Sequence, residues 1–266
     1  MKNIKETIKS ETKALLKEIK TIDFKIAFIF LSLAVIQTIS YYHSSRRFFR
    51  FNLYGYFVDS DNVYFIEYIY WLSSEFIVLF ILPALLIKFL LKGKIRDYGV
   101  KLGDKKTGLF VTGISLVVML PILWIVSSMP SFQNAYPQCD EVRDNWTFFL
   151  IYEFCFFLYM WGWEFIWRGY TLFGLKEKFG YYAILIQMLP FTILHNGKPE
   201  IETFSAILAG IILGILALRT CSFIYGVIIH SGVMFMIDLI STLRYKTQVF
   251  GIGIDSIIDI FKKLPN

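Results

Sequence analysis

The sequence has little charge and few of the residues that bind metals or form disulfides. Of its 266 residues only 18% are charged, and it contains three cysteines and three histidines. Cys139, Cys155 and Cys221 show neither CxxC nor zinc-like spacing, which argues against a disulfide framework. No period of repeat-protein length and no low-complexity segment is evident. The remaining classes are ordinary globular proteins and membrane proteins.

The chain is instead rich in apolar residues, which make up 56% and arrive in long runs. The apolar spans lie at 24–42, 66–91, 108–128, 147–175, 181–196, 203–219 and 221–242. Only helices or closed barrels satisfy their backbone hydrogen bonds in lipid. We therefore expect an all-α, polytopic transmembrane bundle of about seven membrane helices, with amphipathic helices at the two ends.

The net charge of +6 does not indicate nucleic-acid binding. Much of it lies near the ends of apolar segments, where Lys and Arg meet anionic lipid headgroups. We expect lipid and a membrane-associated protein or peptide as partners, and no nucleic acid. The Lys-rich and aromatic-rich composition fits an integral, multi-pass protein of a bacterial cytoplasmic membrane.

The two ends of the chain carry amphipathic patterns. Residues 1–23 place isoleucines and a leucine on one helical face and lysines, starting at Lys2, on others. This pattern fits either a membrane-surface helix or a solvated cytosolic helix. The first 22 residues are too charged for a cleavable signal peptide. We expect residues 24–266 to form a single transmembrane domain, whose tail repeats the surface pattern at Ile254, Ile257, Ile258 and Phe261.

Four ionisable residues lie within or at the end of the apolar spans. Glu164 and Arg168 are four residues apart, so they share a helix face. His195 ends one apolar span and His230 lies inside another. Ionisable side chains cost several kcal/mol, by rough estimate, in a bilayer. Considered alone, Glu164 and Arg168 could equally form a purely structural ion pair, and each histidine could have only a packing role.

Their depth in the bundle indicates a common site. The sequence predicts a chain reversal at residues 177–180; Glu164 lies 14 residues before Lys178, and His195 lies 15 residues after Gly180. Antiparallel helices joined there place both side chains on the order of 20 Å from the turn. The next reversal, near residues 219–221, brings His230 to a similar height. Three separate segments thus contribute polar groups at one depth.

Such a group of residues can activate water. A carboxylate takes a proton from water as a general base, while neutral imidazoles orient the water or stabilise an oxyanion. Alternatively, His195, His230 and Glu164 would hold zinc with one position open for water. In either case Arg168 would orient the carboxylate or neutralise its charge.

These motifs resemble the CPBP family of intramembrane proteases (CAAX proteases and bacteriocin-processing enzymes), also called the Abi family. The family pattern is EExxxR on one helix, FxxxH on the next and HxxxN or HxxxD on a later one. Here Glu164 and Arg168 match the second Glu and the Arg, Phe191 and His195 match the second motif, and His230 matches the third histidine. The resemblance covers roughly residues 95–242.

Two positions depart from the family pattern. Trp163 stands where the family has its first Glu, the expected general base, and Met234 stands where it has Asn or Asp. The chain is similar to a branch of the family with a WEFxxRG first motif and a His-x-Gly-Lys-Pro-x-x-Glu second motif. In this sequence the second motif runs from His195 to Glu202.

The resemblance implies an intramembrane endopeptidase that cleaves a membrane-associated protein or peptide with glutamate/histidine-activated water. Glu164 would activate the water, oriented by Arg168, and His195 and His230 would position it or stabilise the oxyanion. Further candidates are Glu202, Asp238 and Lys198. Both a zinc mechanism and a metal-independent glutamate mechanism stay open. Prenylated CAAX ends, leader peptides and sorting-signal tails are all compatible substrates.

Two other functions stay open. A catalytically inactive relative would act as a membrane scaffold or in immunity to a bacteriocin, and Trp163 and Met234 favour it. A transporter or proton relay could use Glu164, His195 and His230. Inverted repeats or broken helices in both halves would favour a transporter, and the sequence shows neither pattern.

Overall fold

The computed structural model describes residues 4–264, which are helical and contain no β-strand. The predicted all-α membrane bundle is confirmed. Residues 1–3, which include Lys2, and residues 265–266 lie outside the described residues. The helices are α1 (Ile4–Ile19), α2 (Phe24–Ile39), α3 (Arg46–Phe48), α4 (Val63–Phe76), α5 (Leu82–Phe89), α6 (Lys105–Val126), α7 (Pro130–Ala135), α8 (Trp146–Glu164), α9 (Leu172–Phe179), α10 (Tyr182–Ile193), α11 (Glu200–Thr220), α12 (Ile224–Thr247) and α13 (Ile254–Lys263).

Six helical stretches are long and apolar enough to cross a membrane, whereas the sequence predicted about seven. They are Phe24–Tyr56, Val63–Phe89, Lys105–Val126, Trp146–Phe179, Glu200–Thr220 and Ile224–Thr247. The missing one is the predicted span at 181–196, of which only α10 is helical. Twelve residues are roughly 18 Å long, short of a hydrocarbon core of about 30 Å.

Helix α10 is short because the residues that follow it cannot continue a helix. Gly197 has a φ of +98°, and Pro199 restricts the residue before it and carries no N–H. The chain therefore turns between α10 and α11, and α11 begins at Glu200 with Pro199 as its N-cap. This turn leaves His195 on an irregular segment between two helices.

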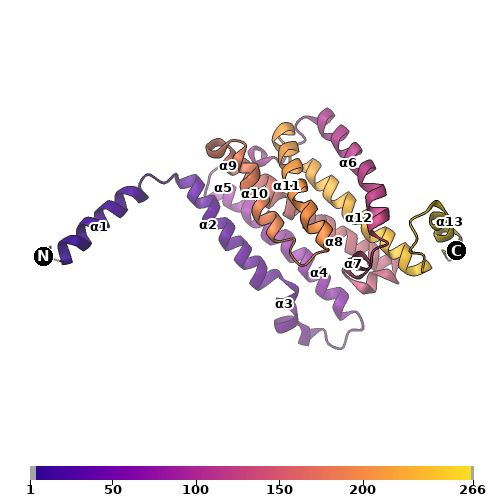
Figure 1. The fold of residues 1–266 in the computed structure, drawn as a ribbon. Helices are drawn as coiled ribbons and strands as arrows, with labels where there is room; N and C mark the ends of the chain where they lie inside the picture. Colours follow the sequence, from indigo (N-terminus) through magenta and orange to yellow (C-terminus); the bar gives the residue numbers. More distant parts are fainter. Residues whose placement is uncertain (1–3, 265–266) are drawn as a thin grey trace.

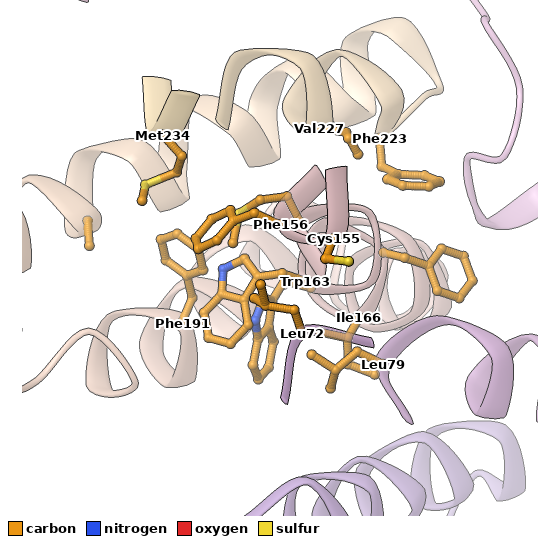
Figure 2. Packing of buried hydrophobic residues seen from close by; sticks show 14 of the residues in the cluster. Leu72, Leu79, Cys155, Phe156, Trp163, Ile166, Phe191, Phe223, Val227 and Met234 are labelled. Atoms are coloured by element: carbon orange, nitrogen blue, oxygen red, sulfur yellow. The ribbon is translucent and has the colours of Figure 1, made fainter. Parts of the chain in front are cut away.

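The bundle is built around α8 and α12. Helix α8 packs against α4 on one side and α12 on the other, α12 also packs against α6, and α10 packs against α11. In Figure 1, α12 lies between α6 and α8, with α11 in front of them. The buried residues between α8, α10 and α12 include Trp163, Phe191 and Met234 (Figure 2).

Helices α6, α11 and α12 are joined at one end of the bundle. The Asp104 N–H donates to the Thr220 carbonyl over 3.0 Å, and the Phe223 N–H donates to the Gly99 carbonyl over 3.3 Å. A Cβ on Gly103 would come within 1.8 Å of the Thr220 carbonyl oxygen, so only glycine permits this approach. These contacts hold the three helices together at this end of the bundle.

The terminal helices extend beyond the bundle. Helix α1 buries none of its residues and projects away from the other helices in Figure 1. Helix α13 lies at the opposite end of the molecule, and of its residues only Ile260 is buried. Both helices form where the sequence predicted amphipathic helices. The division into residues 1–23 and 24–266 stays a prediction.

Candidate active site

Glu164 and Arg168 form a buried ion pair at the junction between α8 and a π-helical turn. The turn covers Phe165–Thr171, and the Arg168 Nη1 donates to the Glu164 Oε1 over 2.9 Å. Both side chains are 0% exposed. The predicted pairing along one helix face is thus made within a distorted turn.

His230 of α12 completes this cluster. Its Nδ1 lies 2.8 Å from the same Glu164 Oε1, and its side chain is 15% exposed. A carboxylate oxygen only accepts hydrogen bonds, so Nδ1 is the donor and Nε2 is left for another partner. Glu164, Arg168 and His230 are called the catalytic cluster below.

Helix α12 can approach Glu164 closely because residue 226 is glycine. A Cβ at Gly226 would lie 2.8 Å from Glu164 Oε2, closer than real Cβ contacts come. This Oε2 atom is buried and has no hydrogen-bond partner among the described residues. Gly226 thus provides the space for the second carboxylate oxygen.

His195 lies beside the catalytic cluster, and Phe191 lies near both histidines. Its Nδ1 donates to the Phe191 carbonyl over 2.7 Å, which leaves Nε2 with a free lone pair. The Phe191 ring lies 4.5 Å from the His195 ring and 6.2 Å from the His230 ring. The Arg168 guanidinium carbon lies 4.0 Å from the centre of the same ring. Phe191, the first residue of the FxxxH motif, is therefore close to both histidines and to Arg168.

Trp163 occupies the space next to His195. Its ring lies 5.9 Å from Phe191 and 6.0 Å from His195, and Figure 2 shows it against Phe191. The indole Nε1 is buried and has no partner among residues 4–264. Met234 is also buried, on α12. Apolar packing thus occupies both positions where the family pattern has a polar side chain.

The two histidines line an apolar cavity of about 420 Å³. Its walls come from α6, α11 and α12, and the end of α10 contributes Phe191 and His195. Glu164 is not among the lining residues and lies behind His230. A molecule in the cavity would therefore meet the histidines before the carboxylate.

Of the further candidates, Glu202 lines another part of this cavity together with Tyr136, and Lys198 contacts Tyr136. The Tyr136 hydroxyl lies 2.6 Å from each Glu202 oxygen, and the Lys198 Nζ donates to that hydroxyl over 3.1 Å. Burial, with the Glu202 carboxylate beside it, raises the pKa of Tyr136 well above its usual value, so the phenol keeps its proton and donates it. Tyr136, Lys198 and Glu202 are called the tyrosine cluster below.

Asp238 does not join the catalytic cluster. It is fully buried, and its electrostatic neighbours are Glu153, Lys198 and Glu202. Eight residues of α-helix correspond to about 80° beyond two full turns, so Asp238 does not share the face of His230. Sequence reasoning missed Tyr136 and Glu153, and neither position carries a motif.

The residues at this site do not fit a zinc ion. Within residues 4–264, no group of three His, Cys, Asp or Glu side chains has the arrangement of a metal site. The Glu164 Oε1 is already bound by Arg168 and His230, and a neighbouring guanidinium disfavours a second cation. We therefore derive no step through a metal.

Comparison with known families agrees with the fold and the motifs. Residues 145–236 match the model of the family described as type II CAAX prenyl endopeptidase Rce1-like. This stretch is less than half of the chain, and it contains Glu164, Arg168, His195 and His230. No curated protein and no solved structure matches.

The match confirms the predicted resemblance to the CAAX protease family. Together with the six apolar helices, it describes an integral, multi-pass membrane protein. At the level of the family, it supports a CAAX-protease-like membrane endopeptidase.

Proposed function

We propose that the protein hydrolyses a peptide bond of a membrane-associated protein or peptide, with His230 and Glu164 acting together on water. The observation that carries this proposal is the position of His230. Its Nδ1 is bound to Glu164, and the same ring lines the apolar cavity. A histidine held by a carboxylate on one nitrogen and open on the other is the arrangement of a general base.

The reaction begins with a water molecule in the cavity at the free Nε2 atom of His230, with His195 lining the same cavity. His230 Nε2 takes one proton while the water oxygen attacks the scissile carbonyl carbon. The protonated imidazole is stabilised by Glu164 Oε1, and the positive charge of Arg168 offsets that carboxylate. His230 then returns the proton to the leaving amine as the C–N bond breaks. We thus assign the proton transfer to His230 rather than to Glu164, the residue that the sequence favoured.

The cavity supports an apolar polypeptide as the substrate. It lies between three membrane helices, and most of its lining residues are apolar. A bacterial cytoplasmic membrane is our proposed location.

The test is cleavage in membranes of a panel of co-expressed precursors with CAAX, leader-peptide or sorting-signal ends. We expect His230→Ala, Glu164→Gln and His195→Ala each to lower cleavage, by about 10²- to 10⁴-fold where proton transfer is lost. His43→Ala is the matched control, because His43 is exposed and lies outside the cavity. If all variants insert normally and the intact protein cuts nothing in the panel, the protein is a non-catalytic relative.

A further inference from the structure

We propose that Glu202 forms a subsite for a cationic group of the substrate, four or five residues away from the scissile bond. This inference rests on the proposed function and names the class of its substrate: an apolar peptide that carries a lysine, an arginine or a free amine at that distance.

The first observation is a carboxylate that lines an apolar cavity without a direct ion pair. Glu202 lines the cavity whose other part holds His195 and His230. Among residues 4–264 it forms no ion pair, and its hydrogen bonds come from the Tyr136 hydroxyl. One phenol proton, shared between two oxygens, leaves a carboxylate with further capacity to accept. A charge facing an apolar cavity is costly unless it is paired.

The second observation is how the neighbouring lysine is used. The Lys198 Nζ donates to the Tyr136 hydroxyl and lies 4.8 Å from the centre of the Tyr136 ring. It is therefore bound to the tyrosine and not to the carboxylate. The hydrogen bonds run from Lys198 to Tyr136 and from Tyr136 to Glu202, which fixes the carboxylate in place.

The third observation is which carboxyl group faces the cavity. Asp238 has Glu153, Lys198 and Glu202 as electrostatic neighbours. Of the three carboxyl groups, Glu202 lines the cavity, whereas Glu153 and Asp238 do not. A cationic group entering the cavity would therefore meet Glu202.

The helices set the distance between this subsite and the histidines. Leu213 of α11 packs with Ile229 of α12, and both line the cavity. Glu202 lies eleven residues before Leu213, so it is roughly 15 Å along the helix axis from His230. An extended peptide covers this distance in about four or five residues.

The experiment measures binding separately from cleavage. Protein in zwitterionic nanodiscs carries Glu164→Gln together with Arg168→Met, which prevents turnover without leaving an unpaired buried charge. It is mixed with an acetylated peptide of leucines that includes a photoreactive leucine. The peptide ends in either lysine amide or norleucine amide, and capture is normalised to the peptide's partition into the nanodiscs. We expect about tenfold more capture of the lysine peptide, as for a hydrogen bond between charged groups.

The variants assign this preference to one side chain. Glu202→Gln should abolish the preference for the lysine peptide, and Glu202→Asp should keep part of it. Glu200→Gln is the matched control, because Glu200 is exposed in the same helical turn and does not line the cavity. If Glu202→Gln does not fold, Tyr136→Phe carries the test. It keeps the ring but removes the hydroxyl that Lys198 donates to, so Lys198 becomes free to pair with Glu202 and the preference should fall several-fold.

The outcomes separate this subsite from the proposed reaction. Equal capture of the two peptides, or a preference that survives Glu202→Gln, overturns the subsite even if the intact protein cleaves precursors. A preference that depends on Glu202, in a protein that cleaves nothing, supports the subsite and overturns the protease.

Discussion

The catalytic cluster and the tyrosine cluster show two ways of keeping polar groups inside a membrane bundle. In the catalytic cluster, Glu164 and Arg168 are fully buried, and one carboxylate oxygen accepts from both Arg168 and His230 within 2.9 Å. In the tyrosine cluster the phenol of Tyr136 stands between the ammonium and the carboxylate, and Glu202 faces the cavity.

Because of this difference, the two clusters should respond differently to substitution. A buried ion pair that loses one partner leaves an uncompensated charge and is strongly destabilised. A carboxylate beside a cavity can instead be reached by water or by a ligand. We therefore expect changes in the catalytic cluster to affect folding and chemistry together, and changes in the tyrosine cluster to act mainly on what binds.

The largest effect should come from Arg168→Ala. It leaves Glu164 without its cation and removes the guanidinium from Phe191, so the free energy of unfolding should fall by about 3–5 kcal/mol. Unfolding in mixed micelles, followed by circular dichroism, measures it. Combining Arg168→Met with Glu164→Gln should restore much of the loss, because no unpaired charge remains. A loss below about 1 kcal/mol for Arg168→Ala, the range of an exposed pair, would show that water reaches this pair.

The next effect should come from Gly226→Ala, which tests the packing of α12 against Glu164. The new Cβ would lie 2.8 Å from Glu164 Oε2 and would displace the carboxylate from His230. We expect cleavage to fall by about 10-fold or more, because misplaced catalytic groups lose rate steeply. Gly113→Ala is the control, since a Cβ there meets nothing within 4 Å. Equal cleavage rates in the two variants would contradict the close approach.

A smaller effect should follow from Tyr136→Phe. The change removes the hydroxyl that links Lys198 to Glu202, and we expect the free energy of unfolding to fall by about 1–3 kcal/mol. The same unfolding experiment measures it. In a Glu202→Gln protein, Tyr136→Phe should lower the free energy of unfolding by less, because a neutral amide gains less than a carboxylate from the phenol's hydrogen bond. Identical losses in the two backgrounds would mean that the phenol does not serve the carboxylate.

The smallest effect should come from a chelator. The side chains around Glu164 do not fit a metal site, so we expect cleavage to be unchanged after EDTA treatment. The measurement compares treated and untreated membranes, with a zinc-dependent protease in the same assay as the control. Loss of cleavage on chelation, with recovery on adding zinc, would contradict the proposed metal-independent reaction.

Much of the fold follows from the apolar runs in the sequence. The predicted span at 147–175 corresponds to the helical stretch Trp146–Phe179, and the predicted reversal falls at Gly180, which has a φ of +54°. The prediction failed for α10, because hydropathy continues to residue 196 while the backbone leaves the helix at Ile193. Hydropathy reports burial in lipid and is insensitive to the turn that Gly197 and Pro199 impose.

Residue spacing along the sequence predicted only part of the candidate site. Counting residues from the turns brought Glu164, His195 and His230 to one depth. The structure places both histidines and Arg168, the partner of Glu164, near Phe191. Spacing along the chain could not give Tyr136, which meets Glu202 across 66 positions of sequence. Such a contact depends on how the loop after α6 folds back onto α11, and no local pattern encodes it.

The central claim is that Glu164 and His230 act as one unit. The most direct test is a double-mutant cycle on cleavage, with Glu164→Gln, His230→Ala and the two combined, in membranes that contain equal amounts of protein. Residues that act as a unit are non-additive, so we predict that the double variant cleaves no more slowly than the slower single variant. Two losses that multiply in the double variant would show that the two side chains act independently, and would contradict the account.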